Sequence, residues 1–306
     1  MKQVLVIGGS YFTGRVHAIL TSKGDSGDGD IHLHVVNRGN YPLNLPNVTQ
    51  YVCDRHNTAK LAEVLPDITF DAVVDFCGYE PNDISSVVNA LADRIKQYIF
   101  ISTCSVYDSL GDDPKVETDP MLHNFAGGVI DDYVMKKCLL EIELTNICAA
   151  KNIPYTILRP AFIYGPFNYA PRESYFIKHI AEGTPVPVPT DATARFSFVY
   201  VMDIADIINM SVANPKAYNE IFNLAGSHET YNSLLDTLEK CNGGPFNTQL
   251  VTVKEVYDKN IPLPFPLNVD QLYSGKKVED VFEYKYTPFE TGMKKTFTVF
   301  KNVYSK

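Results

Sequence analysis

The residues of this chain best suited to chemistry are a tyrosine and a lysine four positions apart, Tyr133 and Lys137. They stand in segment 131–137, which has the pattern of the first turns of a helix that reaches about residue 150. Residues four apart share one face of a helix. A cation beside a phenol favours the phenolate and lowers the tyrosine pKa from its usual value of about 10. The pair is therefore a candidate proton donor and acceptor, although this spacing also occurs by chance on many surface helices.

Composition limits the classes of protein to which this chain can belong. Its 306 residues suffice for one large domain or two modest ones, and 36 acidic against 27 basic residues give a net charge of −9. That balance argues against a nucleic acid or an anionic membrane as the main partner. The six cysteines show no paired spacing, the chain opens directly on a strand-like run, and no apolar run is long enough to cross a membrane. We therefore expect a cytoplasmic protein with free thiols. The histidine spacing predicts no metal site.

The first half of the chain alternates short apolar runs with helical patterns. Strands are predicted at 3–7, 31–36, 48–53, 70–76 and 97–102, with helices at 14–22, 57–64 and 82–94 between them. Near-continuous β-branched runs are typical of parallel strands that are buried on both faces. The rhythm predicts an α/β fold with a doubly wound, Rossmann-type parallel sheet, whose ligands bind beyond the carboxyl ends of the strands.

A glycine turn follows the first predicted strand, in the sequence Gly8-Gly9-Ser10-Tyr11-Phe12-Thr13-Gly14. A strand, a glycine turn and a helix in this order predict a pyrophosphate site, because backbone N–H groups at the start of the helix can hold the anion. Tyr11 stands where the middle glycine of the usual dinucleotide pattern lets the backbone approach the pyrophosphate. The alternative interpretation of this turn is a simple tight connection between strand and helix.

The next strand ends predict the rest of a cofactor site. Asn37 and Arg38 end the second strand, where an acidic residue would contact the ribose of NAD. An arginine suits a 2′-phosphate, so NADP is favoured over NAD, although Arg38 is as readily a solvated surface residue. Asp54 is expected at the adenine edge. Cys77 and Gly78 follow the fourth strand, near the expected cofactor.

The fifth strand ends in Ser102-Thr103-Cys104-Ser105, some thirty residues before Tyr133. This constellation resembles the short-chain dehydrogenase/reductase superfamily, in its extended epimerase/dehydratase branch. The turn from Gly8 to Gly14 is similar to that of the atypical group, described as isoflavone-reductase-like or chloroplast RNA-binding-like. The resemblance covers nearly the whole chain.

The resemblance implies roles for individual residues. Thr103 would orient the substrate oxygen, Tyr133 would be the catalytic acid and base, and Lys137 would tune Tyr133 and bind the nicotinamide ribose. The family pattern also implies further contacts: cofactor residues Gly8, Gly9, Ser10, Tyr11, Phe12, Gly14, Asn37, Arg38, Asp54, Cys77, Gly78, Lys137 and Pro160, and substrate residues Tyr79, Cys104, Ser105, Phe162, Asn168 and Arg172.

A small C-terminal lobe is the second unit that the resemblance implies. Residues 1–165 with 195–225 would form the NAD(P)-binding domain, and 166–194 with 226–306 the substrate-binding lobe. Helices are predicted at 174–182, 231–241 and 289–302, and Asp203 is expected to cap the helix that follows a strand at 196–201. A homodimer packed through the helices near 82–94 and 129–150 is expected.

Two positions depart from the pattern of nucleotide-sugar enzymes. Phe162 stands where those enzymes usually carry an asparagine, and Arg195 lies one residue before the position of their phosphate-binding arginine. Both departures disfavour a diphosphate ligand, so UDP- and dTDP-sugars are expected to be poor ligands.

Three function classes remain open on the sequence. The first is an NAD(P)-dependent epimerase, dehydratase or reductase that acts by hydride transfer on a sugar-like or other hydroxyl or carbonyl substrate. The second is a non-catalytic NAD(P)-sensing regulator, which the altered glycine turn favours and the retained Thr103, Tyr133 and Lys137 disfavour. The third is RNA binding, suggested by the chloroplast relatives and opposed by the acidic balance.

Overall fold

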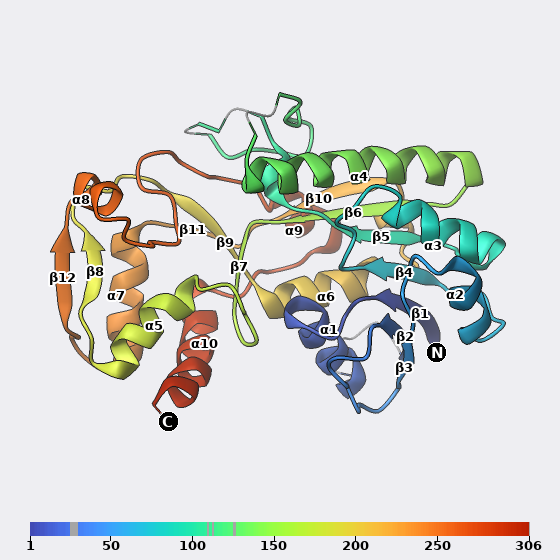
Figure 1. The fold of residues 1–306 in the computed structure, drawn as a ribbon, viewed down its shortest axis with the longest axis horizontal. Helices are drawn as coiled ribbons and strands as arrows, with labels where there is room; N and C mark the ends of the chain where they lie inside the picture. The colour runs from blue at the N-terminus through green and yellow to red at the C-terminus, as the bar shows by residue number, and fades with distance from the viewer. Residues whose placement is uncertain (25–29, 109, 112, 125–126, 306) are drawn as a thin grey trace.

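A parallel sheet forms the centre of the larger part of the molecule (Figure 1). The structure is a computed structural model that describes residues 1–24, 30–108, 110–111, 113–124 and 127–305. Within these residues seven parallel strands have the order β10-β6-β5-β4-β1-β2-β3. Their bounds are β1 (Lys2–Ile7), β2 (Ile31–Asn37), β3 (Val48–Val52), β4 (Ala72–Asp75), β5 (Tyr98–Ile101), β6 (Tyr155–Pro160) and β10 (Glu220–Leu224). This arrangement confirms the predicted Rossmann-type α/β fold.

Helices cover both faces of this sheet (Figure 1). One face packs against α2 (Thr58–Val64), α3 (Asp83–Leu91) and α4 (Val129–Lys151). The other packs against α1 (Phe12–Lys23), α6 (Val201–Ser211) and α9 (Lys276–Phe282). The strands are apolar on both sides because each side faces a helical layer.

A second, smaller lobe holds an aromatic core at the other end of the molecule. It contains the sheet β11-β9-β7 and the pair β12-β8. The bounds are β7 (Phe162–Tyr164), β8 (Val186–Pro189), β9 (Phe196–Tyr200), β11 (Ser227–Glu229), β12 (Thr248–Val251), α5 (Glu173–Glu182), α7 (Tyr231–Asn242), α8 (Val253–Asp258) and α10 (Phe289–Tyr304). Rings of Phe196, Phe198 and Phe265 stack or meet edge to face at its centre. Short 3-10 helices occur at η1 (Ala92–Arg94), η2 (Cys104–Val106) and η3 (Pro215–Ala217).

One predicted detail of α6 is wrong. Asp203 does not cap this helix, whose N-cap residue is Tyr200 and has no side-chain cap hydrogen bond. The Asp203 carboxylate instead accepts hydrogen bonds from the hydroxyls of Tyr284 and Thr287, at 2.9 and 2.6 Å. It ties the connection between α9 and α10 to α6, a contact between distant segments that a local capping pattern does not reveal. The proposed division into two domains stays a prediction.

Candidate active site

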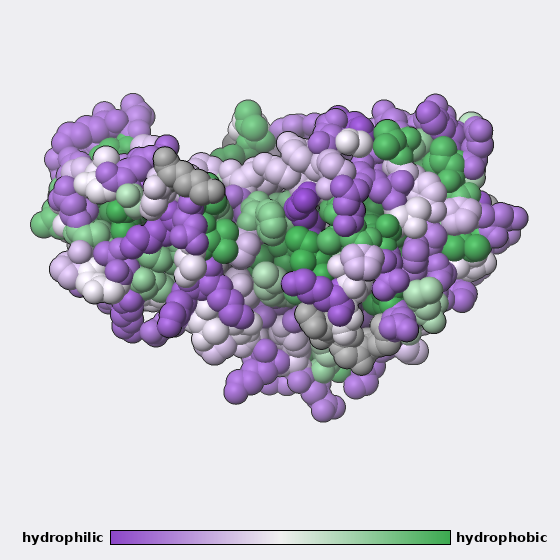
Figure 2. Space-filling view, turned by 90° about the horizontal axis from the view of Figure 1, so that it is seen from below, coloured by the Kyte–Doolittle hydropathy of each residue, from purple (hydrophilic) through white to green (hydrophobic). Residues whose placement is uncertain are grey.

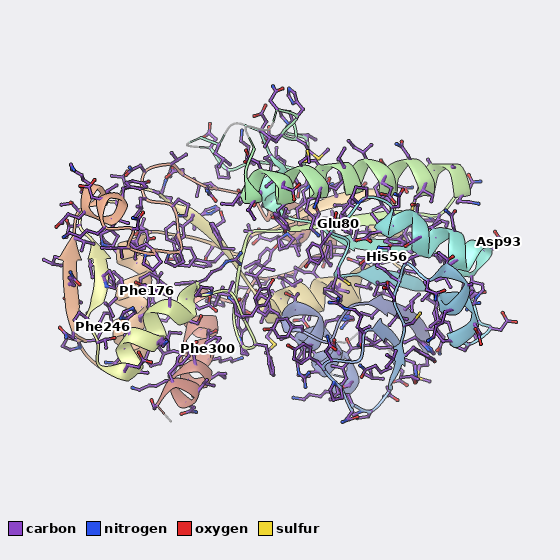
Figure 3. The ribbon with its side chains drawn as sticks, viewed as in Figure 1. His56, Glu80, Asp93, Phe176, Phe246 and Phe300 are labelled. Carbon is purple, nitrogen blue, oxygen red and sulfur yellow. The ribbon has the colours of Figure 1, made fainter. Side chains whose placement is uncertain are left out.

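A cavity of about 610 Å³ opens at the carboxyl ends of the parallel strands. Apolar surface gathers in the middle of the face shown in Figure 2, between the two ends of the molecule. His56 and Glu80, which border the cavity, lie on the sheet side, whereas Phe176 and Phe246 lie in the lobe (Figure 3). The predicted site residues that line the cavity are Gly8, Gly9, Ser10, Tyr11, Phe12, Gly14, Asn37, Arg38, Asp54, Cys77, Tyr79, Thr103, Tyr133, Lys137, Pro160, Asn168 and Arg172.

The glycine turn leaves no room for side chains at three of its positions. A Cβ on Gly8 would lie 2.5 Å from Cys77 Sγ, and one on Gly9 would lie 2.5 Å from Val6 Cγ1. A Cβ on Gly14 would lie 2.3 Å from the Gly9 Cα, a backbone atom that cannot move aside. Helix α1 therefore starts in close contact with the turn, and the first N–H groups of a helix are free to bind an anion.

Three tyrosines from separate segments stack beside this turn. The Tyr11 ring lies 5.0 Å from that of Tyr41 and 5.1 Å from that of Tyr169, with interplanar angles of 20° and 25°. We call these residues the tyrosine stack. Tyr11 comes from the glycine turn, Tyr41 from the loop after β2, and Tyr169 from the loop before α5, and all three border the cavity. The stack bridges the cavity edge beside the pyrophosphate position.

The end of β2 offers an unused donor to a ligand. Asn37 Oδ1 accepts hydrogen bonds from Gly39 N and Gln50 Nε2, while its Nδ2 is buried and has no partner among the described residues. Arg38 is exposed at the cavity edge. The Asp54 carboxylate is engaged by the backbone and ring nitrogens of His56, at 2.9 and 3.0 Å.

A buried ion pair that the sequence did not reveal reaches the cavity through Arg55. Arg55 donates two hydrogen bonds to Asp75, at 3.0 and 2.6 Å, and one to the Cys77 carbonyl oxygen at 3.0 Å. Burial alone would raise the pKa of Asp75, but Arg55 and the Tyr98 hydroxyl hold it below its usual value. Arg55 follows β3 and Asp75 ends β4, and β1 and β2 lie between these strands in the sheet, so no local pattern in the sequence revealed the pair. This pair fixes the backbone at Cys77.

Lys137 is buried at the junction of β4 and β5. Its Nζ donates to the carbonyl oxygens of Gly78 and Ile101, both at 2.9 Å, and lies 4.7 Å from the ring centres of Tyr79 and Phe100. Burial lowers the pKa of Lys137 to about 8. An ammonium has three donors, so one N–H remains for a ligand.

Tyr133 differs from expectation in the pKa of its hydroxyl. The residue is 39% exposed, and burial nevertheless raises the pKa of its hydroxyl above the usual value. A hydrogen bond with Thr103 and the charge of Arg172 oppose that rise. The predicted lowering of the pKa by Lys137 is therefore wrong for this state, because the Lys137 ammonium is directed at two carbonyl oxygens. Thr103 also accepts a hydrogen bond from Ser105 N at 3.1 Å, which holds its hydroxyl in place.

A second buried ion pair supports Ser102, the residue before Thr103. Glu141 on α4 accepts from Ser102 Oγ at 2.5 Å and from Arg159 Nε and Nη2 at 3.0 and 2.6 Å. Arg159 precedes Pro160, which lines the cavity. The carboxyl ends of β5 and β6 are thus held to the helix that carries Tyr133.

Four predicted contacts do not reach the cavity lining. Gly78 lies behind it and offers its carbonyl oxygen to Lys137. Cys104 is buried, and its Sγ donates to the Arg159 carbonyl oxygen at 2.9 Å. Ser105 is exposed on η2 and accepts from Thr103 Oγ1 at 3.2 Å. Phe162 packs its ring edge to face against Phe265 in the lobe core.

A match to one protein-family model identifies the family of this chain. Residues 4–225 match the model of the NAD dependent epimerase/dehydratase family. The chain belongs to this family. The family is the extended branch to which the sequence resemblance pointed, and the match spans the glycine turn, Thr103, Tyr133 and Lys137.

Individual proteins are also similar to this chain in sequence. The chain is 28% identical over 260 residues to the chloroplast stem-loop binding protein of 41 kDa b of Arabidopsis thaliana, covering 80% of this chain and 64% of that protein. The chain spans less than two thirds of the length of the curated relatives it matches.

Solved structures of family members share the fold. UDP-N-acetylglucosamine 4-epimerase of Methanobrevibacter ruminantium aligns with a TM-score of 0.78 at 20% identity, covering 99% of both chains. dTDP-glucose 4,6-dehydratase of Bacillus anthracis, solved with NAD, aligns with a TM-score of 0.78 at 19% identity, covering 99% of this chain and 97% of that one. At such identities the likeness shows the fold alone. Within the described residues no helix is long and apolar enough to cross a membrane, and no group of His, Cys, Asp and Glu has the geometry of a metal site.

Proposed function

We propose that this chain is an NAD(P)-dependent enzyme that acts on a hydroxyl or carbonyl substrate, with Tyr133 as its acid and base. The observation that carries the proposal is one cavity with two chemically different ends. The glycine turn stands at one end, and Thr103, Tyr133 and Lys137 stand at the other. Membership of the family supports the same conclusion.

The residues of the cavity fit a dinucleotide. The glycine turn borders the cavity at the start of α1, where the backbone N–H groups of a helix N-terminus can hold a pyrophosphate. The unpartnered Asn37 Nδ2 is a donor for a ribose hydroxyl. The remaining N–H of Lys137 can bind the second ribose.

The chemistry that such a cofactor supplies when bound is hydride transfer. Tyr133 removes the proton from a substrate hydroxyl, or returns one to a carbonyl oxygen, at its own phenolic oxygen. Thr103, hydrogen-bonded to that phenol, orients the substrate oxygen. Lys137 holds its ammonium in the same cavity, and a bound ligand that draws it toward Tyr133 would favour the phenolate.

NADP preference remains part of the proposal. Arg38 is exposed at the cavity edge, beside Asn37 rather than an acidic residue. A guanidinium there favours a 2′-phosphate, whereas an acidic residue would repel it.

Nucleotide binding is the first test of this function. NADPH and NADH are titrated against the protein while nucleotide fluorescence is followed. We expect both to bind, NADPH more tightly, and Arg38→Ala to weaken NADPH by about tenfold while sparing NADH. If neither nucleotide binds, the proposed function is refuted. If NADH binds more tightly than NADPH, only the NADP preference is refuted.

A substrate screen completes the test. Alcohols, ketones and sugars are incubated with NAD(P), and both absorbance and products are analysed, because an epimerase regenerates its cofactor in each turnover. UDP- and dTDP-sugars are expected to bind weakly, because neither residue at the two departing positions is free to hold a diphosphate. Arg195 pairs with Asp270 on the surface, and Phe162 packs in the lobe core.

A further inference from the structure

The cationic side chains that border the cavity differ in how they are neutralised. In the described part of the chain, the arginine and lysine side chains that border the cavity are Arg38, Arg55, Lys137 and Arg172. Arg55 forms a bidentate ion pair with Asp75, and Lys137 donates to two carbonyl oxygens. Arg38 stands beside the ribose position of the proposed cofactor. Arg172 is left at the opposite end, beside Thr103 and Tyr133.

Arg172 has little to compensate its charge. Its Nη1 donates one long hydrogen bond, 3.3 Å, to the Ile163 carbonyl oxygen, and its guanidinium lies 5.4 Å from the ring centre of Phe162. Throughout the ranges that the structure describes, no carboxylate forms an ion pair with it. The guanidinium is partly buried in a protein whose net charge is −9. A partly desolvated cation without a partner is unfavourable, and a bound anion would relieve it.

The charge of the neighbouring Glu173 favours the charged form of Arg172, but among the described residues the two form no ion pair. Glu173 is fully buried, and its carboxylate accepts from Gly165 N at 3.0 Å and from Asn168 Nδ2 at 3.2 and 3.0 Å. Burial raises the pKa of Glu173 to about 7. Burial also lowers the pKa of Arg172. The Glu173 carboxylate is therefore held by hydrogen bonds within its own loop.

We propose that Arg172 binds an anionic group of the substrate, a carboxylate or a phosphate, close to the carbon that reacts. This inference rests on the proposed function, which it narrows to hydroxylated acids and sugar phosphates. Arg172 lines the same end of the cavity as Thr103 and Tyr133. A guanidinium can donate two parallel hydrogen bonds to a pair of oxygens of either a carboxylate or a phosphate. The exposed rings of Tyr79 and Tyr169, also at the cavity, offer apolar faces to the carbon skeleton of a sugar.

Calorimetry with matched sugars tests the inference. Protein saturated with NAD is titrated with D-glucose 6-phosphate, D-glucuronate and D-glucose, which differ in whether and how they carry a charge. At least one of the two anions is expected to bind about 10- to 100-fold more tightly than glucose, the scale of a charge-assisted hydrogen-bonded pair. Arg172→Gln should abolish this difference, and Arg172→Lys should retain most of it. Preference for the phosphate or for the carboxylate identifies the group.

A matched control lies on α5, the helix that begins directly after Arg172. Lys178→Gln removes one positive charge from an exposed position of α5, where the lysine pairs with Glu182 at 3.8 Å, and it should leave the anion preference unchanged. Equal binding of all three sugars to the wild type, or an unchanged preference in Arg172→Gln, would overturn the inference. NADH binding by each variant is measured in parallel. If the wild type binds neither NADH nor NADPH, the proposed function is contradicted, whereas nucleotide binding by the wild type confines any failure to the role of Arg172.

Discussion

Burial and neighbouring groups shift the pKa of the Tyr133 hydroxyl in opposite directions. Burial disfavours the phenolate, while the Thr103 hydrogen bond and the charge of Arg172 favour it. A phenol of pKa about 10 is only about a thousandth ionised at pH 7, so a further cation must assist if it is to act as a base. Lys137 is the nearest candidate along α4, provided that a bound ligand draws its ammonium from the carbonyl oxygens of Gly78 and Ile101.

Tyr133→Phe isolates the contribution of the phenolic oxygen. The ring and its packing remain, and only the titrating group is lost. Turnover of the substrate found by screening should fall by about two to four orders of magnitude, the usual scale for a missing general acid or base. Nucleotide binding and the unfolding midpoint should stay close to the wild type. Full activity in this variant would remove Tyr133 from the mechanism.

Glu173 makes the stability of the fold depend on pH in a defined direction. Burial raises the pKa of this carboxyl from 4.5 in a model compound to about 7 in the fold. The folded state therefore binds the proton more strongly than the unfolded state does. The stabilisation is fully present below pH 4.5 and is lost as pH rises through about 7.

Glu173→Gln should remove this dependence, since the amide is neutral at every pH and keeps one acceptor oxygen for Gly165 N. The wild type should lose stability relative to the variant between pH 4.5 and about 7, by up to about 1.4 kcal/mol per pH unit. Urea unfolding of both proteins at pH 5, 6, 7 and 8 measures the difference. A difference that does not vary with pH would contradict the assignment.

At the scale of elements, two loops and the glycine turn are joined by the tyrosine stack. Tyr11 contacts Tyr41 and Tyr169 at ring distances of 5.0 and 5.1 Å, so the loop before α5 is held against the start of α1. A dinucleotide on the glycine turn would have to part this contact to leave. The missing middle glycine thus has a structural consequence, because only a side chain at position 11 can form the stack.

Tyr169→Ala should speed the release of bound NADH by about 2- to 10-fold, since an aromatic pair contributes about 0.5–1.5 kcal/mol. Stopped-flow fluorescence after displacement by excess NAD measures the rate. Tyr257→Ala is the control, because this tyrosine is 64% exposed on α8, away from the cavity lining. Identical release rates in all three proteins would show that the stack does not retain the cofactor.

The net charge of the whole molecule argues against RNA binding as its function. The Arabidopsis relative is a stem-loop binding protein, which keeps that alternative in view. A net charge of −9 offers little general attraction for phosphates. Filter binding or fluorescence anisotropy with an RNA stem-loop should show weak affinity that collapses as salt rises through physiological values. Submicromolar binding that persists at physiological salt would favour RNA binding over the enzyme proposed here.

The sequence by itself determined where the parallel strands lie along the chain. Runs such as 4–7 and 98–101 are apolar because the sheet is covered on both faces, and this pattern is local. The glycine turn and the pair Tyr133 and Lys137 are also local patterns. The residues of the first lie in one turn and those of the second on one helix, so both could be recognised from the sequence.

Only the tertiary structure decided which side chains reach the cavity. Cys104 and Phe162 lie at the expected strand ends, yet one points to the Arg159 carbonyl oxygen and the other into the lobe core. Side-chain direction after a strand depends on how the chain leaves the sheet, which no local pattern records. The Arg55–Asp75 pair, the tyrosine stack and the uncompensated Arg172 likewise join segments distant in the chain. Their partners become known only when those segments are brought together in the fold.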